Sequence, residues 1–251
     1  MGKRLKQQVR GRGTPRYLAP SHRFKVDLSY RNYDDIEKTG IITGEVVEFV
    51  DDPGRTSILA LLRLDDNTKL HIIAPEGLAM GDRVEIGSQA KVSVGNILPL
   101  YAIPDGLYIY NLEIRPGDGG KLVKSSGNYA VVVSKDDKYV YVKMPSKKII
   151  KFDPDARAQI GVICGGGVKD KPLLKAGNAF YKMRARNRRW PGNRGVKMSP
   201  VDHPFGGKQH HKGKSSSVAR GTPPGRKVGH IASRQTGRRG KAAQETTKGE
   251  Q

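Results

Sequence analysis

The chain has 251 residues, with 46 Lys and Arg against 24 Asp and Glu, and therefore carries a net charge of +22. Its single cysteine, Cys164, excludes an internal disulfide and a cysteine-based zinc site. No stretch approaches the roughly 20 apolar residues that a transmembrane helix requires. Residues 1–8 are basic but lack the apolar region of a signal peptide. We therefore expect a cytoplasmic protein with no membrane partner.

The positive charge is concentrated at the two ends of the chain. Residues 1–38 have a net charge of +6 and residues 171–251 a net charge of +17, whereas residues 39–120 have a net charge of −6 and residues 121–170 one of +5. A uniformly solvated surface would not divide its charge in this way. Such asymmetry is typical of proteins that bind nucleic acid or another polyanion.

Residues 1–38 are predicted to be a basic N-terminal extension. Gly11, Gly13 and Pro15 interrupt the helix that a transit peptide would need. The basic side chains of this segment are its candidate RNA contacts: Arg10, Arg12, Arg16, His22 and Arg23.

From residue 41 to residue 164 the chain alternates short apolar runs with turn residues. Val, Ile, Leu and Tyr dominate the runs, and Asp, Asn, Gly and Pro separate them at intervals of about ten residues, which is typical of small sandwiches or barrels. The predicted strands are Ile41–Val50, Ser57–Leu64, Lys69–Ala74, Arg83–Ile86, Leu107–Ile114, Asn128–Ser134, Tyr139–Met144 and Lys148–Phe152. The length of this region favours two small barrels, with a break near Gly87–Lys91 or Gly95–Pro99.

Residues 171–251 are predicted to be a basic extension rich in glycine and proline. A short helix is expected near Ala176–Arg184. After Ser199 the large apolar residues are few, namely Val201, Phe205, Val218, Val228 and Ile231. Burying so few side chains does not offset about 1–2 kcal/mol of backbone entropy per residue, so we expect a polyanion to order this segment.

The densest basic run, residues 184–190, ends in the only tryptophan of the chain. Guanidinium groups bind phosphate through paired N–H donors, so its arginines are predicted to contact RNA. The indole of Trp190 has two interpretations of equal weight, stacking on an RNA base or packing against the protein.

Residues 198–207 place Asp202 beside His203 between two prolines. Neighbouring residues of an extended chain point to opposite sides, so we favour a positioned hydrogen bond to RNA over a general base. His203, His210 and His211 match no common zinc spacing, and the glycine runs match no nucleotide-binding loop. No metal, cofactor or small-molecule substrate is therefore expected.

Several motifs together resemble the universal large-subunit ribosomal protein family L-two, in its archaeal and eukaryotic type. The similarity covers essentially the whole chain. The motifs include Ala19-Pro20-Ser21-His22-Arg23, Pro116-Gly117-Asp118-Gly119-Gly120-Lys121, Ser126-Gly127-Asn128-Tyr129-Ala130, Lys175-Ala176-Gly177-Asn178, Val201-Asp202-His203-Pro204-Phe205-Gly206-Gly207 and Pro223-Pro224-Gly225-Arg226-Lys227-Val228-Gly229. Phe205 stands where bacterial members of the family carry a second histidine.

The resemblance implies an all-β fold of two small barrels between long basic extensions. An OB-fold barrel over residues 39–88 and an SH3-like barrel over residues 89–170 would follow the N-terminal extension. The implied function is that of a structural constituent of the large ribosomal subunit, not an enzyme. The implied partners are large-subunit ribosomal RNA and neighbouring ribosomal proteins, with contacts to small-subunit RNA and tRNA as a further expectation.

The resemblance also implies roles in subunit association, in tRNA binding and in the architecture around the peptidyl transferase centre, where Asp202 and His203 would give support without catalysing. The predicted RNA contacts outside the N-terminal extension are Lys121, Lys171, Lys175, Arg184, Arg186, Arg188, Arg189, Trp190, Arg194, His203, Lys208, His210, Arg226, Lys227 and Arg234. Two other hypotheses stay open, an enzyme that uses Asp202 and His203, and a free translation or chromatin factor with basic tails.

Overall fold

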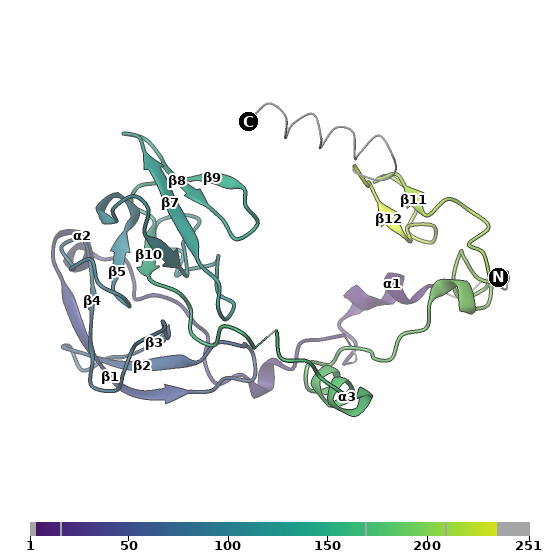
Figure 1. The fold of residues 1–251 in the computed structure, drawn as a ribbon, viewed down its shortest axis with the longest axis horizontal. Helices are drawn as coiled ribbons and strands as arrows, with labels where there is room; N and C mark the ends of the chain where they lie inside the picture. Colours follow the sequence, from purple (N-terminus) through teal and green to yellow (C-terminus); the bar gives the residue numbers. More distant parts are fainter. Residues whose placement is uncertain (1–3, 16, 169, 209, 235–251) are drawn as a thin grey trace. The chain divides into compact units, whose positions relative to one another are not determined.

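The computed structural model describes residues 4–15, 17–168, 170–208 and 210–234 (Figure 1). The chain divides into two compact units, one of residues 21–172 and one that joins residues 1–20 to residues 173–251. Each unit is described by itself. Within the described residues, no helix is long and apolar enough to cross a membrane.

Strands dominate the first unit, and the prediction of a mainly β protein is confirmed. Its strands are β1 (Ile42–Val50), β2 (Leu59–Leu64), β3 (Lys69–Ile73), β4 (Arg83–Ile86), β5 (Ile97–Pro99), β6 (Tyr108–Tyr110), β7 (Ala130–Lys135), β8 (Val140–Lys143), β9 (Ile149–Phe152) and β10 (Arg157–Ile160). The 3-10 turns η2 (Ser21–Arg23) and η3 (Leu100–Ala102) and the short helix α2 (Asp35–Thr39) complete it.

These ten strands are hydrogen-bonded in the order β3-β2-β1-β4-β5-β10-β6-β7-β8-β9. All neighbours are antiparallel except β4 and β5, which form one parallel contact at Ile86 and Ile97. That contact joins a first group of strands, β1 to β4, to a second group, β5 to β10. Closure of either group into a barrel stays a prediction.

The strands expected from the alternation of apolar runs and turns are present, most of them shifted by one or two residues. The helix expected near Ala176–Arg184 is also present, as α3 (Ala176–Ala185). Leu107–Ile114 forms only the shorter strand β6. The sequence analysis missed β5, β10 and α2, each of which has five residues or fewer.

Three apolar clusters form the core of residues 21–172. One includes Val46, Leu62 and Ile72 of the first strand group together with Ile97 of β5, and another lies within the second group and includes Ile109 and Val142. A smaller cluster draws on both groups and consists of Leu28, Leu59, Ile73, Tyr110 and Ile163. The two strand groups therefore share buried side chains as well as backbone pairing.

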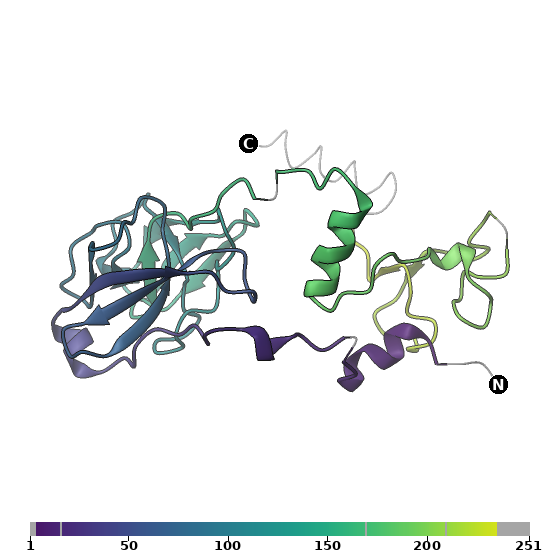
Figure 2. The same ribbon diagram turned by 90° about the horizontal axis from the view of Figure 1, so that it is seen from below.

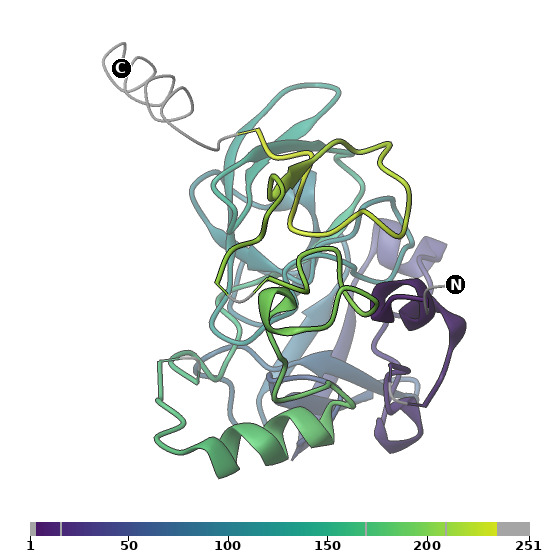
Figure 3. The same cartoon turned by 90° about the vertical axis from the view of Figure 1, so that its right-hand side faces the viewer.

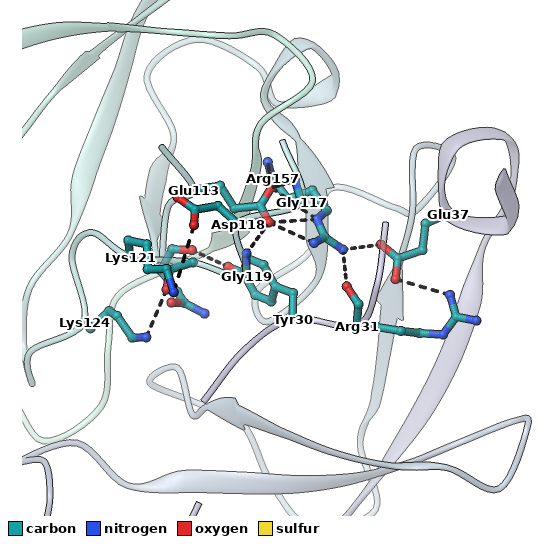
Figure 4. A network of polar contacts seen from close by, with 12 residues as sticks. Tyr30, Arg31, Glu37, Glu113, Gly117, Asp118, Gly119, Lys121, Lys124 and Arg157 are labelled. Atoms are coloured by element: carbon teal, nitrogen blue, oxygen red, sulfur yellow. Dashed lines mark hydrogen bonds and ion pairs between the residues drawn. The ribbon is translucent and has the colours of Figure 1, made fainter. Parts of the chain in front are cut away.

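A buried ionic network also joins distant segments of this unit (Figure 4). The Arg157 guanidinium donates to Glu113 Oε1 at 2.8 Å and to Glu37 Oε2 at 2.6 Å, and its exposed fraction is 2%. It also donates to the Arg31 carbonyl oxygen at 2.8 Å and lies 5.2 Å from the centre of the Tyr30 ring. Residues 30–37 are thereby fastened to strand β10.

The second unit contains α1 (Lys6–Val9), η1 (Arg10–Arg12), α3, η4 (Gly195–Lys197) and a two-stranded parallel ladder of β11 (Ser217–Val218) and β12 (His230–Ile231). Figures 2 and 3 show two further views, with the N-terminal segment in dark purple and the C-terminal segment in green to yellow. Leu5, Phe205 and Val228 are buried together, with Val196 against them. Residues after Ser199 thus have a small apolar cluster, which the sequence analysis missed because Leu5 comes from the other end of the chain.

Replacing Arg157 by Met should destabilise the unit of residues 21–172 by about 3–5 kcal/mol, because Glu113 would stay buried without a cation and Glu37 would keep only Arg31, at 3.6 Å. Urea unfolding followed by circular dichroism measures the change. The control is Arg63→Ala, which removes an exposed ion pair to Glu45 and should cost at most about 1 kcal/mol. Equal effects of the two substitutions would contradict the assigned role of Arg157.

Candidate RNA interface

Most of the predicted RNA contacts lie at the surface. In the unit of residues 21–172, His22, Arg23, Lys121 and Lys171 are exposed. In the other unit the exposed ones are Arg10, Arg12, Lys175, Arg184, Arg186, Arg188, Arg189, Arg194, Lys208, His210, Arg226 and Arg234, together with Asp202. Trp190, His203 and Lys227 are half-buried. Arg16 lies outside the described residues.

The glycine turn before Lys121 is held by the buried network (Figure 4). Glu113 accepts from the Gly119 N–H at 2.8 Å and from the Gly117 N–H at 3.3 Å, while its carboxylate also binds Arg157. Gly120 has φ +81°, and a Cβ there would lie 2.4 Å from the Asn111 side chain. Only glycine fits, so this turn carries Lys121 in a fixed position.

The turn forms one wall of a cationic cavity of about 510 Å³, whose lining includes Asp27, Ser29, Arg55, Lys121 and Lys124. The Arg55 guanidinium is oriented by Asp52 at 2.7 Å and by the Val26 carbonyl oxygen at 3.1 Å. Lys124 Nζ donates to the Gly120 carbonyl oxygen at 3.0 Å. Three cations therefore converge here beside Asp27, although Asp52 already pairs with Arg55 and Asp118 lies 4.0 Å from Lys121 Nζ. Their guanidinium and ammonium groups can still donate to a phosphate.

The environment of Lys124 shows that the cations of this cavity repel one another. Burial lowers the pKa of Lys124, and the positive charges of Arg55 and Lys121 lower it further. A bound phosphate would relieve this repulsion. The sequence analysis identified Lys121 but missed Arg55 and Lys124, because nothing in the sequence shows that residues near 55 and 124 lie together.

A tight loop positions the His203 imidazole. The N–H groups of Asp202 and His203 donate to the Ser199 carbonyl oxygen at 3.0 and 3.1 Å, and the Gly207 N–H donates to Met198 at 3.1 Å. The Phe205 N–H donates to His203 Nδ1 at 3.1 Å. A Cβ on Gly195 would lie 2.3 Å from His203 Cε1, so the imidazole packs directly against backbone.

This geometry gives Asp202 and His203 separate roles. Asp202 is exposed, and Nδ1 of His203 is already engaged by the Phe205 N–H. Burial lowers the pKa of His203, which favours the neutral imidazole at pH 7. Nε2 then carries the proton and is the nitrogen left to donate a hydrogen bond, as a positioned RNA contact requires.

The end of α3 brings three predicted RNA contacts together. Arg184, Arg188 and Trp190 line a second cavity, of about 430 Å³, with Phe180, Asn187 and Pro15.

No group of three or more His, Cys, Asp or Glu side chains placed to hold a metal ion occurs among the residues described.

Two family models match the chain. Residues 3–86 match the model described as "Ribosomal Proteins L2, RNA binding N-terminal domain", and residues 93–227 match "Ribosomal Proteins L2, C-terminal domain". Together the two ranges cover most of the chain, including the cationic cavity, the loop around His203 and the end of α3. The chain belongs to the L2 ribosomal protein family.

Curated relatives agree with this family. Proteins named "Large ribosomal subunit protein uL2" are 49% identical in Methanopyrus kandleri over 96% of this chain, 50% in Methanococcus vannielii over 95%, and 48% in Natronomonas pharaonis over 98%. Each match spans the full length of the relative. The predicted resemblance is thereby confirmed, and the family is one of ribosomal proteins rather than enzymes.

Replacing Gly195 by Ala should displace the His203 imidazole, because the new Cβ would overlap its ring. The histidine ring signals in an NMR spectrum of the full chain measure the displacement. Gly192→Ala is the matched control, since a Cβ at that position meets no atom within 4 Å. Unchanged His203 signals in the Gly195 variant would refute the packing described here.

The pKa of His203 should lie below that of an unperturbed histidine. Since burial disfavours the charged form, His203 should bind its proton at a lower pH in the folded than in the unfolded chain. Its contribution to stability is therefore present above pH about 6.5 and is lost as the pH falls below that value. An NMR titration measures this pKa, and one at or above that of a free histidine would contradict the buried position.

Proposed function

We propose that this chain is a structural constituent of the large ribosomal subunit that binds large-subunit ribosomal RNA. The observation that carries the proposal is the contrast between a buried cation that has carboxylate partners and exposed cations that have none. Buried Arg157 has two carboxylate partners, whereas the arginines near the end of α3 are exposed and have no carboxylate partner among the described residues, namely Arg184, Arg186, Arg188 and Arg189. Unpaired surface cations supply sequence-independent affinity for a phosphate backbone.

The finer fold proposal is an OB-fold barrel over residues 39–88 followed by an SH3-like barrel over residues 89–170. Residues 1–38 and 171–251 serve as the basic extensions of these barrels. Two apolar clusters support this proposal, one mainly of residues from β1 to β4 and one from β5 to β10, and they meet at Ile97 of β5 and in the smaller shared cluster. Small barrels present rigid faces and loops to RNA.

The further roles proposed are subunit association, tRNA binding and support of the architecture around the peptidyl transferase centre. The partners proposed are neighbouring ribosomal proteins, with small-subunit RNA and tRNA as additional contacts, and the place of action is the ribosome. His203 supports this proposal because its imidazole is oriented by backbone on two sides. Asp202 would act beside it without a catalytic step.

The enzyme hypothesis loses its geometric basis. A general base needs an oriented partner and a substrate site, and the Nδ1 atom of His203 is occupied by a backbone N–H. A free factor with basic tails and a ribosomal constituent differ in how firmly they stay bound to large ribosomal subunits. The constituent should stay on large subunits through a high-salt wash, whereas a factor should be released.

Deleting residues 199–251 should weaken binding to deproteinised large-subunit ribosomal RNA strongly and flatten its dependence on salt. Each lost phosphate contact should reduce the slope of log affinity against log salt by about 0.7–0.9. Binding is measured by filter retention between 50 and 300 mM KCl.

Thermal unfolding supplies the control for this deletion. The strands of residues 21–172 lie outside the deleted segment, so their transition should be unchanged. The proposal would be wrong if the shortened chain bound RNA with the affinity and the salt slope of the full chain.

A further inference from the structure

The second cavity, at the end of α3, combines aromatic rings with arginines. Its lining consists of Pro15, Phe180, Arg184, Asn187, Arg188 and Trp190, and its volume is about 430 Å³. That volume lies within the range of about 300–1,000 Å³ found for small-ligand pockets. We propose that this pocket holds one unstacked base of the bound RNA. The proposal rests on the proposed RNA-binding function and deepens it.

Local backbone chemistry builds the pocket. Phe180 and Arg184 are four residues apart in α3 and therefore share a face of the helix. Asn187 ends the helix with φ +49°, a left-handed conformation that asparagine tolerates. The Arg188 N–H then donates to Met183 at 2.8 Å and the Asn187 N–H to Arg184 at 3.1 Å. This reversal turns Arg188 and Trp190 back toward the helix.

The N-terminal segment closes another side of the pocket. The Asn187 side chain donates to the Leu18 carbonyl oxygen at 3.2 Å, which fastens Leu18 to the end of α3. Thr14 accepts from the N–H groups of Tyr17 and Leu18 in a tight turn. Pro15 thereby contributes a rigid apolar wall. The pocket needs residues about 170 positions apart, so the sequence does not show it.

The lining matches the two chemical properties of a nucleobase. A base has flat π faces, which stack on aromatic rings and on guanidinium planes, and Phe180, Trp190, Arg184 and Arg188 offer both. It is joined to a phosphate, which the same arginines can bind. Within the described residues, neither Arg184 nor Arg188 has an acidic side chain as a partner.

A ring from a protein partner is the competing occupant. The charge around the pocket favours RNA, because residues 184–190 hold four arginines and no acidic residue. Phe180 is 42% exposed, and Trp190 is half-buried, so neither ring is fully buried in an apolar core. An aromatic side chain would leave these cations without an anion.

Trp190 is the only tryptophan of the chain, so its fluorescence reports on this pocket alone. The full chain is titrated with deproteinised large-subunit ribosomal RNA, and separately with a fully paired RNA duplex that has no unstacked base. We expect the ribosomal RNA to quench Trp190 emission at saturation and the duplex to leave it nearly unchanged. Equal quenching by both, or no quenching by bound ribosomal RNA, overturns the proposal.

Substitutions on α3 separate stacking from charge. Phe180→Leu keeps apolar bulk but removes the π face, so affinity for ribosomal RNA should fall about tenfold with an unchanged salt slope. Tyr181→Leu is the matched control, because Tyr181 is 68% exposed and does not line the pocket. Binding by the Phe180 variant equal to that of the Tyr181 variant would also overturn the proposal. Far-ultraviolet circular dichroism verifies that both variants are folded.

The readouts distinguish this proposal from the proposed function. If the full chain fails to bind ribosomal RNA, both fail. If it binds with a steep salt slope while Trp190 emission and the Phe180 variant are unaffected, only the base pocket is wrong. Quenching by ribosomal proteins stripped of RNA, without quenching by RNA, would assign the pocket to a protein side chain instead.

Discussion

The contact on which the described fold depends most is the one between Arg157 and its two carboxylates. The guanidinium connects β10 to Glu37 of α2 and to Glu113, which follows β6, and it lies over the rings of Tyr30 and Tyr33 at 5.2 and 4.9 Å. Burial alone would lower the pKa of Arg157, but the hydrogen bonds and charges of Glu113 and Glu37 raise it, so the cation persists. The segment before the first strand is thus held by charge as well as by the buried ring of Tyr30.

The same network determines how positive charge is presented at the surface. One carboxylate, that of Glu113, binds Arg157 and also orders the glycine turn that ends at Lys121. The buried ion pair between Glu113 and Arg157 therefore also fixes the glycine turn that forms one wall of the cationic cavity. The cations at the cavity are paired less completely. Arg55 and Lys121 have one carboxylate partner each, and Lys124 donates to the Gly120 carbonyl oxygen, with no carboxylate partner among the described residues. Positive charge that the fold leaves without a carboxylate at its surface attracts a polyanion.

The sequence predicts the longer strands because turn residues separate apolar runs at regular intervals. It predicts α3 as well, although this helix has no buried residue. It does not reveal β10, because Arg157 and Gln159 place polar side chains in a strand that is buried at every position. These polar groups can be buried because the structure gives each of them a hydrogen-bond partner. Arg157 donates to Glu113, and Gln159 donates to the Gly95 carbonyl oxygen. The sequence does not predict the two cavities for a related reason, because each is lined by residues that only the tertiary structure brings together.

The C-terminal segment shows how a chain with few apolar residues can still acquire shape. Phe205 is 7% exposed and packs with Leu5 and Val228, so its ring supplies the apolar surface that this loop otherwise lacks. The His203 ring lies 5.1 Å from it, with its Nδ1 atom held by the Phe205 backbone. A histidine at position 205 would bury a polar ring there, at a cost that hydrogen bonds would have to offset. Phenylalanine avoids that cost and leaves one oriented imidazole, that of His203, at the tip of the loop. The shape of this loop therefore arises from a few backbone contacts around two rings.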